Sequence, residues 1–262
     1  MERPALELID THCHLDYEPL AGSREAVLVR AEAAGVRAML SIGTSVETSR
    51  ANLELAHRYP QVFAAVGVHP HEADSVTAED LAAIEALAAD PRVVAVGEIG
   101  LDFYYKNSSV DGQRRAFQSF LAIARRRDLP IAIHCRDAYD PLLEILRATA
   151  PSWKGVIHCA SGTPAFIEAA LALGFYVSFS GTVTFPSAKA TRELVPLVPD
   201  ERLLIETDAP FLAPQPVRGQ ANEPAYLAHT ATCLAQLRDM STEALGVLTA
   251  RNARRLFQLP SA

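Results

Sequence analysis

Short apolar stretches alternate with amphipathic stretches along nearly the whole chain of 262 residues. The apolar stretches are short and rich in β-branched side chains, which is typical of strands that are buried on both faces. We predict eight such strands, at residues 6–10, 38–42, 63–68, 93–99, 130–134, 155–158, 175–179 and 202–206.

The segments between these strands carry apolar side chains at helical spacing. We expect helices at residues 24–34, 46–58, 78–89, 112–127, 139–149, 164–173 and, more weakly, 188–195, with two more at 224–238 and 242–257. Strict alternation of strand and helix implies parallel strands joined by helical crossovers. Eight units of this kind predict an α/β fold, a (β/α)8 TIM barrel, with residues 1–262 as one domain. An open doubly wound sheet is the alternative, but the glycine-rich first turn of that fold is absent.

Composition narrows the class of protein further. Hydrophobic residues make up 49% of the chain, enough for a large core, and the net charge is −7. This charge argues against binding nucleic acid by overall attraction, although it leaves room for a local basic cleft. The sequence has neither a signal-peptide pattern nor an apolar run of membrane-spanning length. We therefore expect a cytoplasmic protein with no membrane association, and we infer no obligate protein partner.

The cysteines fit a reducing compartment. No CxxC pattern occurs, and three of the four cysteines directly follow a histidine. Alternation along a strand would turn these thiols away from the histidine face, so we interpret them as small buried hydrophobic side chains. The four are Cys13, Cys135, Cys159 and Cys233.

Polar side chains gather where the predicted strands end. In a barrel of this kind the chemistry lies at the C-terminal ends of the strands. His12 and His14 follow the first strand and would share one face of an extended chain. Alone, this pair could equally be two histidines in a turn. Five of the eight histidines in the chain, however, fall at predicted strand ends, which favours a common site. The later strand ends contribute Glu98, His134, His158 and Asp208.

Four imidazoles and two carboxylates suit Zn²⁺, Mn²⁺, Ni²⁺ or Fe²⁺ better than Ca²⁺. Six protein ligands are too many for one catalytic cation that keeps an open position, so we expect two divalent cations. A hydroxide shared by them would be the nucleophile, and Asp208 would accept the proton of that water. The alternative is a buried polar network without metal. The assignment is His12, His14 and Asp208 on one cation, His134 and His158 on the other, and Glu98 bridging both.

With these residues in view, the sequence resembles the TatD family of metal-dependent deoxyribonucleases, which are amidohydrolase-like TIM barrels. The matching motifs occur in family order over almost the whole chain and are specific as a set. They are Asp10-Thr11-His12-Cys13-His14, Gly67-Val68-His69-Pro70, Gly97-Glu98-Ile99-Gly100-Leu101-Asp102, Ile133-His134, Ile157-His158-Cys159, Ser178-Phe179-Ser180-Gly181, Glu206-Thr207-Asp208-Ala209-Pro210, and Arg218-Gly219 with Asn222-Glu223-Pro224.

The resemblance implies hydrolysis of phosphodiester bonds, often as a 3′–5′ exonuclease on single strands, with two divalent cations. The substrate would then be single-stranded DNA or DNA 3′ ends, and the candidate cations are Mg²⁺, Mn²⁺, Zn²⁺ and Ni²⁺. Glu98 stands where related amidohydrolases often use a carboxylated lysine. Two positions depart from the family pattern: Ala160, where an aromatic residue is common, and Gln220, where a basic residue is common.

Three further polar groups are expected beside the predicted ligands. His69 is not needed as a ligand, so it would hydrogen-bond either a substrate phosphate oxygen or a ligand side chain. Glu206 shares a face with the predicted ligand Asp208 but lies one layer deeper in the barrel, and it is expected to orient a ligand histidine. Asp102 would steer Lys106 or Arg218, or it would only cap its own loop.

Several loop residues are candidates for contacts with substrate. Tyr105 and Lys106 follow the fourth predicted strand, where they could stack a base and hold a phosphate, and Phe211 lies on a neighbouring loop. The alternative is that these aromatic side chains only pack the loops. Arg218 is the best candidate to clamp a phosphate, because guanidinium matches its geometry. By contrast, Arg251 is interpreted as a solvated residue outside any nucleic-acid patch.

Two other functional classes remain open on the residues alone. A small-molecule amidohydrolase or esterase, such as a lactonase or a deacylase, would use the same pair of cations. A phosphodiesterase needs cationic side chains and an open groove, whereas a small-molecule enzyme needs a closed pocket. A binding protein that uses the barrel only as a scaffold is disfavoured by the complete set of ligands.

Overall fold

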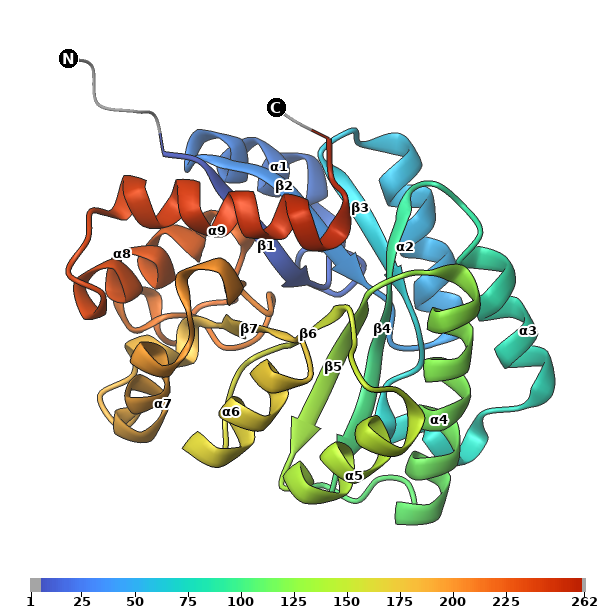
Figure 1. The fold of residues 1–262 in the computed structure, drawn as a ribbon. Helices are drawn as coiled ribbons and strands as arrows, with labels where there is room; N and C mark the ends of the chain where they lie inside the picture. The colour runs from blue at the N-terminus through green and yellow to red at the C-terminus, as the bar shows by residue number, and fades with distance from the viewer. Residues whose placement is uncertain (1–5, 261–262) are drawn as a thin grey trace.

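Eight parallel strands form one sheet in the order β1 to β8, as the sequence predicts (Figure 1). The computed structural model describes residues 6–260. The strands are β1 (Leu8–Cys13), β2 (Val36–Ile42), β3 (Val62–Val66), β4 (Val93–Asp102), β5 (Ile131–Arg136), β6 (Gly155–Ile157), β7 (Tyr176–Phe179) and β8 (Leu203–Ile205).

The sheet closes where β1 meets the end of β8. Cys13 and Ala209 form an isolated parallel bridge. The backbone N–H of His14 donates to the carbonyl of Ala209 at 2.7 Å, and that of Asp208 donates to the carbonyl of His12 at 2.8 Å. The (β/α)8 TIM barrel predicted from the alternation of elements is therefore confirmed.

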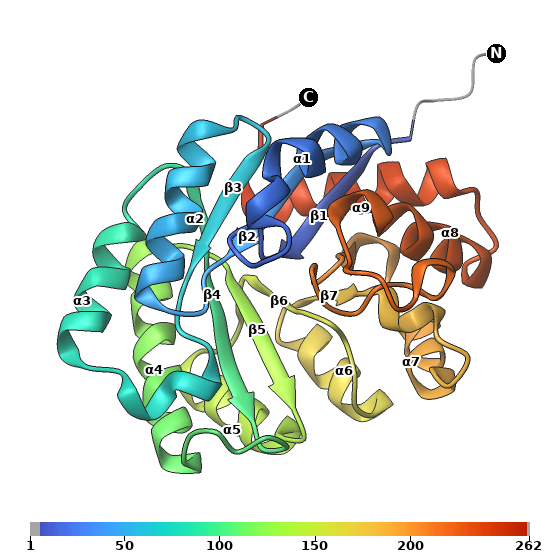
Figure 2. The same cartoon turned by 180° about the vertical axis from the view of Figure 1, so that it is seen from behind.

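The helices before α9 surround the sheet on its outer side (Figures 1 and 2). Capping boxes begin α2 at Ser45 and α3 at Thr77. Within the described residues the α-helices are α1 (Arg24–Ala33), α2 (Val46–Arg58), α3 (Ala78–Leu87), α4 (Val110–Arg127), α5 (Tyr139–Thr149), α6 (Pro164–Ala172), α7 (Lys189–Leu194), α8 (Leu227–Leu237) and α9 (Thr242–Phe257).

The barrel interior is apolar at one end and polar at the other. Inner apolar side chains, among them Ala132 of β5, Val156 of β6 and Leu204 of β8, form one cluster with Ala253 and Phe257 of α9. Helix α9 therefore covers the N-terminal ends of the strands (Figure 1). Because side chains alternate along a strand, the residue two positions beyond each inner apolar residue also faces inward, nearer the C-terminal end. These positions are His134, His158 and Glu206.

Three strands extend further at their C-terminal ends than the sequence analysis predicts. β1 continues to Cys13, β4 to Asp102 and β5 to Arg136. Polar residues at these positions look like strand ends in sequence, yet inside a barrel their backbone groups pair with the neighbouring strands. His12 consequently lies on β1 itself and not beyond its end. The predicted helix at 224–238 is also divided, into a 3-10 turn at Pro224–Tyr226 followed by α8.

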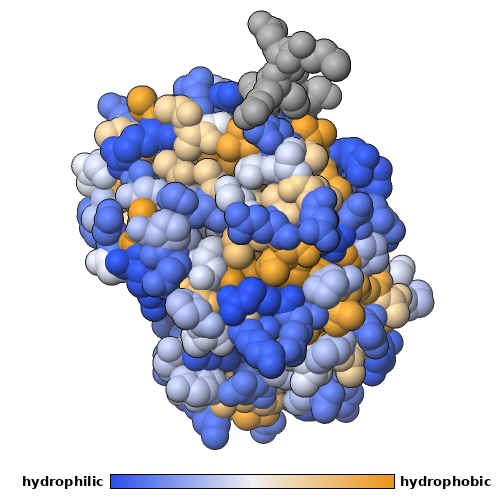
Figure 3. Space-filling model, turned by 90° about the vertical axis from the view of Figure 1, so that its left-hand side faces the viewer, coloured by the Kyte–Doolittle hydropathy of each residue, from blue (hydrophilic) through white to orange (hydrophobic). Residues whose placement is uncertain are grey.

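Polar residues predominate on one face of the molecule. Figure 3 shows hydrophilic residues over most of one face, with apolar residues gathered toward its centre. Within residues 6–260, no helix has both the length and the apolar composition needed to cross a membrane.

Candidate metal centre

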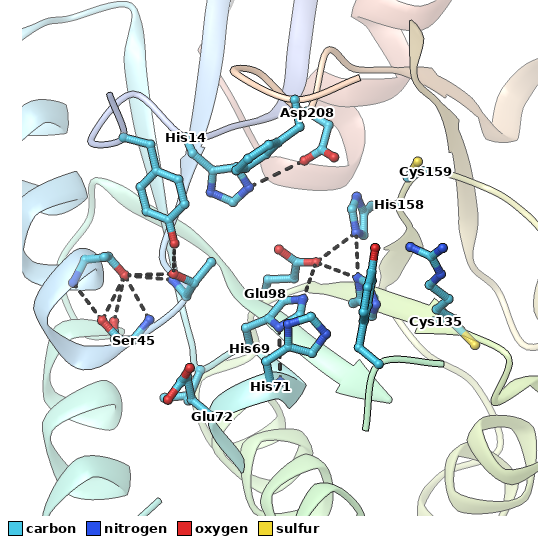
Figure 4. Close-up of a pocket in the computed structure, with 18 of the residues that line it drawn as sticks. His14, Ser45, His69, His71, Glu72, Glu98, Cys135, His158, Cys159 and Asp208 are labelled. Carbon is cyan, nitrogen blue, oxygen red and sulfur yellow. Dashed lines mark hydrogen bonds and ion pairs between the residues drawn. The ribbon is translucent and has the colours of Figure 1, made fainter. Parts of the chain in front are cut away.

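A cavity of about 1250 Å³ opens at the C-terminal ends of the strands. Glu98 lies in its middle, with His14 and Asp208 on one side and His69 and His71 on another (Figure 4). The strands bring together all six predicted ligands in this region. His12 is fully buried beneath the cavity.

Glu98 is contacted by four imidazoles. Its Oε1 atom lies 2.9 Å from His158 Nε2, 3.0 Å from His134 Nδ1 and 3.5 Å from His69 Nε2. Its Oε2 atom lies 3.3 Å from His12 Nε2. Burial alone would raise the pKa of Glu98, but the imidazoles, His158 foremost, hold that pKa well below its usual value. Glu98 is therefore a carboxylate that faces ring nitrogens on several sides.

His14 faces Asp208 with the nitrogen that could bind a cation. His14 Nδ1 donates to the carbonyl of Ile42 at 3.0 Å, and Nε2 lies 3.5 Å from Asp208 Oδ1. A neutral ring with this tautomer presents a lone pair to a carboxylate, so a proton or a cation is needed between the two atoms. Burial lowers the pKa of His14, but the hydrogen bond and charge of Asp208 raise it more. His12 Nε2 lies 3.7 Å from the same Asp208 oxygen.

His134 and His158 have a carboxylate at both ring nitrogens. Besides Glu98, His134 contacts Asp102 Oδ2 at 3.0 Å, and His158 Nδ1 contacts Glu206 Oε1 at 3.2 Å. Although burial opposes protonation of His158, the charges of Glu98 and Glu206 raise its pKa well above the usual value. A cation in place of a ring proton would relieve the same excess of negative charge.

The residues present fit divalent cations. Both ring nitrogens of His12 and the Oε2 atom of Glu206 are buried without a hydrogen-bond partner among the described residues. Buried imidazole nitrogens in this state are the donors that such cations use. Ligand atoms within 4.8 Å of one another form three groups: His12, His14 and Asp208; His69, Glu98 and His134; and His12, His158 and Glu206.

The first group has the same members as the first predicted ligand set. The other two groups differ from the second predicted set, because they place His69 beside His134 and Glu206 beside His158. His69 Nδ1 accepts from the backbone N–H of His71 at 3.1 Å, which leaves the proton of a neutral ring on Nε2. Burial lowers the pKa of His69 to about 3. This ring is therefore a neutral donor, which favours hydrogen bonding over metal ligation.

Asp102 orients side chains around the site. Its Oδ2 atom lies 3.0 Å from His134 Nε2 and 3.0 Å from His71 Nε2. Its Oδ1 atom accepts from the backbone N–H groups of Tyr104 and Tyr105. Of the two expected roles, the loop cap is present. In the part of the chain that the structure describes, no contact joins Asp102 to Lys106 or Arg218, so the steering role is not found, because the carboxylate is already occupied by two imidazoles.

The loop candidates separate into two groups. Tyr105, Phe211 and His69 line the cavity. Lys106 and Arg218 are exposed and are not among its lining residues, and the Arg218 guanidinium instead lies over the ring of Phe185, 4.2 Å from its centroid.

Two residues at the site were not assigned from the sequence. His71 lies on the 3-10 turn Pro70–Ser75 and shares Asp102 with His134. Arg136 lines the cavity at the end of β5. Arg136 could have been found, since it is two residues beyond His134 and so on the same face of the strand. No sequence signal pairs His71 with Asp102, because that contact depends on the folded loop.

The thiols are free, as expected. Cys13 Sγ lies 3.4 Å from the carbonyl of Leu40. Cys135 and Cys159, however, border the cavity, which differs from the expected orientation away from the site. The reason at Cys159 is local: its backbone has a positive φ of 44°, so strict strand alternation does not apply there.

A (β/α)8 barrel with buried imidazoles and carboxylates at the C-terminal ends of its strands defines a metal-dependent hydrolase. The family model described as TatD related DNase matches residues 9–258, and the chain belongs to this family.

Similarity to known proteins supports this assignment and extends over almost the whole length of each protein. The chain is 40% identical over 253 residues to an uncharacterised metal-dependent hydrolase of Bacillus subtilis, YabD, covering 96% of this chain and 99% of that protein. It is 40% identical over 258 residues to the 3′-5′ ssDNA/RNA exonuclease TatD of Salmonella typhimurium, with 96% and 99% covered. The crystal structure of the TatD homologue YjjV from Escherichia coli K12 superposes with a TM-score of 0.91 at 34% identity, covering 97% and 98%.

Proposed function

We propose that this hydrolase cleaves phosphodiester bonds of single-stranded DNA, from the 3′ end, with two divalent cations. The observation that carries the proposal is Glu98, a buried carboxylate contacted by four imidazoles beside Asp208 on the floor of an open cavity. The relative named as a 3′-5′ ssDNA/RNA exonuclease supports the substrate and the direction.

The proposed ligands are His12, His14 and Asp208 for one cation, His134 and His158 for the other, and Glu98 between them. When bound, cations at this site would neutralise phosphate charge and make water more acidic. The alternative noted from the sequence, a network without metal, leaves both buried ring nitrogens of His12 without a hydrogen bond, although Nε2 lies 3.3 Å from Glu98 Oε2.

The chain's own residues would perform the remaining steps. The Asp208 side chain is 15% exposed and faces the cavity, so it can accept the proton of the attacking water. As that water adds to phosphorus, the bond from phosphorus to the leaving nucleoside oxygen breaks, and this oxygen takes up a proton from Asp208 or from solvent to leave as the alcohol. His69, neutral and carrying its proton on Nε2, donates to a phosphate oxygen. Asp102 and Glu206 hold His134 and His158 in place from behind.

The first experiment follows the digestion of labelled single-stranded oligonucleotides with Mg²⁺, Mn²⁺ or Zn²⁺. The expected result is stepwise shortening that is abolished by chelator and blocked by a modified 3′ end, but not by a modified 5′ end. Protection by the 5′ block alone would reverse the proposed direction.

The second experiment replaces the central carboxylate. Glu98→Ala is expected to lose bound metal and to lower activity at least about 100-fold, because a ligand has been removed. Glu85→Ala, which removes a surface carboxylate paired with Arg126, is the matched control. Unchanged metal content in Glu98→Ala would contradict the bridging role.

A second candidate, a small-molecule amidohydrolase or esterase, is favoured by one observation. The cavity lining includes the carboxylates of Glu47, Glu72, Asp80 and Asp137, which repel a chain of phosphates. The same preparations should therefore be assayed on lactones and esters. Turnover of these compounds beside intact oligonucleotide would favour the second candidate.

A further inference from the structure

Arg136 is a cation held at the rim of the candidate site. It ends β5, two residues beyond His134, so both side chains project to the same face of the strand. At about 3.3 Å per residue, its Cα lies about 7 Å further toward the cavity mouth than that of His134. Arg136 is therefore near the proposed metal ligands but outside them.

Aromatic rings hold this guanidinium in place. Its central carbon lies 4.2 Å from the ring centroid of Tyr104 and 4.7 Å from that of Tyr105. The two rings meet edge to face, and Asp102 caps the loop that carries them by accepting both backbone N–H groups. A guanidinium that lies on a ring keeps its N–H edges available for an oxyanion. The Arg136 side chain is thus positioned before any ligand arrives.

No carboxylate neutralises this cation. Within residues 6–260, the Arg136 side chain forms neither an ion pair nor a hydrogen bond, and it is the one lysine or arginine among the residues that line the cavity. By comparison, Arg30 at the surface makes a bidentate ion pair with Glu223, donating from Nε to Oε1 and from Nη2 to Oε2. A guanidinium with five unoccupied donors at the rim of a site is suited to a bidentate anion such as phosphate.

The opposite side of the cavity has the opposite charge. Glu47 at the start of α2, Glu72 on the 3-10 turn and Asp80 on α3 line that side. In Figure 4, Ser45 and Glu72 lie on one side of Glu98, whereas Cys135, the neighbour of Arg136, lies on the other. Asp137, next to Arg136, also lines the cavity, so this side carries charges of both signs, whereas the first side carries three carboxylates and no lysine or arginine among the lining residues. A chain of phosphates that leaves the centre is therefore repelled more strongly in the first direction than in the second.

We propose that Arg136, held over Tyr104 and Tyr105, binds the substrate phosphate next to the one that is hydrolysed and so directs the polynucleotide over the end of β5. This inference rests on the proposed function and names the part of the same site that would distinguish a polynucleotide from a small diester. The half-exposed tyrosine rings, 56% and 54% exposed, offer a surface for the base of the same nucleotide.

The test compares Arg136→Gln and Arg136→Lys with Arg251→Gln, a matched charge removal on α9 away from the cavity. Activity is measured on a short oligothymidylate and on bis(p-nitrophenyl) phosphate, which contains one phosphate. In Arg136→Gln the KM for the oligonucleotide should rise about tenfold or more with kcat largely retained, because a charge-assisted hydrogen bond is lost outside the reacting atoms. The ratio of kcat/KM for the oligonucleotide to that for the diester should fall by the same factor. Arg251→Gln should keep the wild-type ratio.

A binding measurement provides a readout that does not depend on turnover. Fluorescence anisotropy of a labelled oligothymidylate, titrated with protein in the presence of chelator, gives the association constant K. Repeating the titration at several salt concentrations gives the dependence of log K on the logarithm of the salt concentration. Removing one phosphate contact should reduce the steepness of this dependence by about 0.7 in Arg136→Gln, and Arg136→Lys should restore the slope without fully restoring affinity. An unchanged slope, or an equal loss on both substrates, would overturn the role of Arg136. If the wild-type protein cleaves neither substrate, the proposed function itself is wrong.

Discussion

At the scale of single residues, the site depends on how buried charges are shared. Glu98 and Asp208 are acidic groups that remain ionised inside the barrel because imidazoles surround them. His134 and His158 are in turn held between two carboxylates each. This mutual dependence means that removing any one member leaves a buried charge without its partner, which is costly.

The thiols beside the site give a prediction at this scale. Burial raises the pKa of all four cysteines, and that of Cys159 to about 12. At pH 8 only about one Cys159 thiol in 10,000 would be a thiolate, the reactive form. The native protein should therefore react slowly with a disulfide reagent such as DTNB, and all four thiols should react at once in guanidinium chloride. Rapid native labelling at Cys159, located by mass spectrometry, would contradict this expectation.

Some residues of this site could be predicted from sequence patterns, and others could not. His12, His14 and His134 could be predicted because strand periodicity places them on one face. The shared contact of His71 and His134 with Asp102 could not be predicted, since it depends on how two loops fold against each other. The sequence also does not show which loop side chains reach the cavity. Lys106 and Arg218 carry the positive charge that a phosphate site needs, but the structure places both outside the cavity lining.

At the scale of elements, β4 and β5 approach each other closely at Gly100. This glycine has a φ of +145° and is paired with His134, and a Cβ added to it would overlap the His134 carbonyl. Both strands carry proposed ligands, so their spacing determines the geometry of the centre. A side chain at Gly100 would force either the strands or their ligands apart.

Gly100→Ala is accordingly expected to destabilise the protein by about 3 kcal/mol or more, because backbone strain is added to a clash with a backbone atom. Gly219→Ala is the matched control: its φ is also positive, at +92°, but nothing lies within 4 Å of an added Cβ. The control should cost only about 1 kcal/mol. Urea unfolding followed by circular dichroism measures both free energies. Equal losses would show that the close approach of the two strands is unimportant.

The type and order of the elements could be predicted, but several of their ends could not. Each of the eight predicted strands is present, because runs of β-branched residues leave few alternatives. The end of β1 was predicted at residue 10 and lies at Cys13. Polar residues normally end a strand, and only tertiary pairing with β2 and with Ala209 extends this one.

At the scale of the whole molecule, cations should link the strands and so stabilise the fold. A ligand present at 100 times its dissociation constant adds about 2.7 kcal/mol per site. For a chain of this size, that corresponds to a rise in Tm of about 5–10 °C. Thermal unfolding with and without Zn²⁺ or Mn²⁺ tests this, with Glu98→Ala as a variant that should respond less. Identical melting curves in metal and in chelator would mean that the imidazole cluster holds no cation.

Closure of the barrel has a consequence for synthesis of the protein. The two hydrogen bonds that join β1 to the segment after β8 also bring Asp208 to His12 and His14. Asp208 is separated from these two histidines by nearly 200 positions in the polymer. A nascent chain on the ribosome therefore lacks the complete set of donors until most of its length has emerged. The proposed site for His12, His14 and Asp208 would then take up its cation only late in the life of each new molecule, after translation has passed the eighth strand.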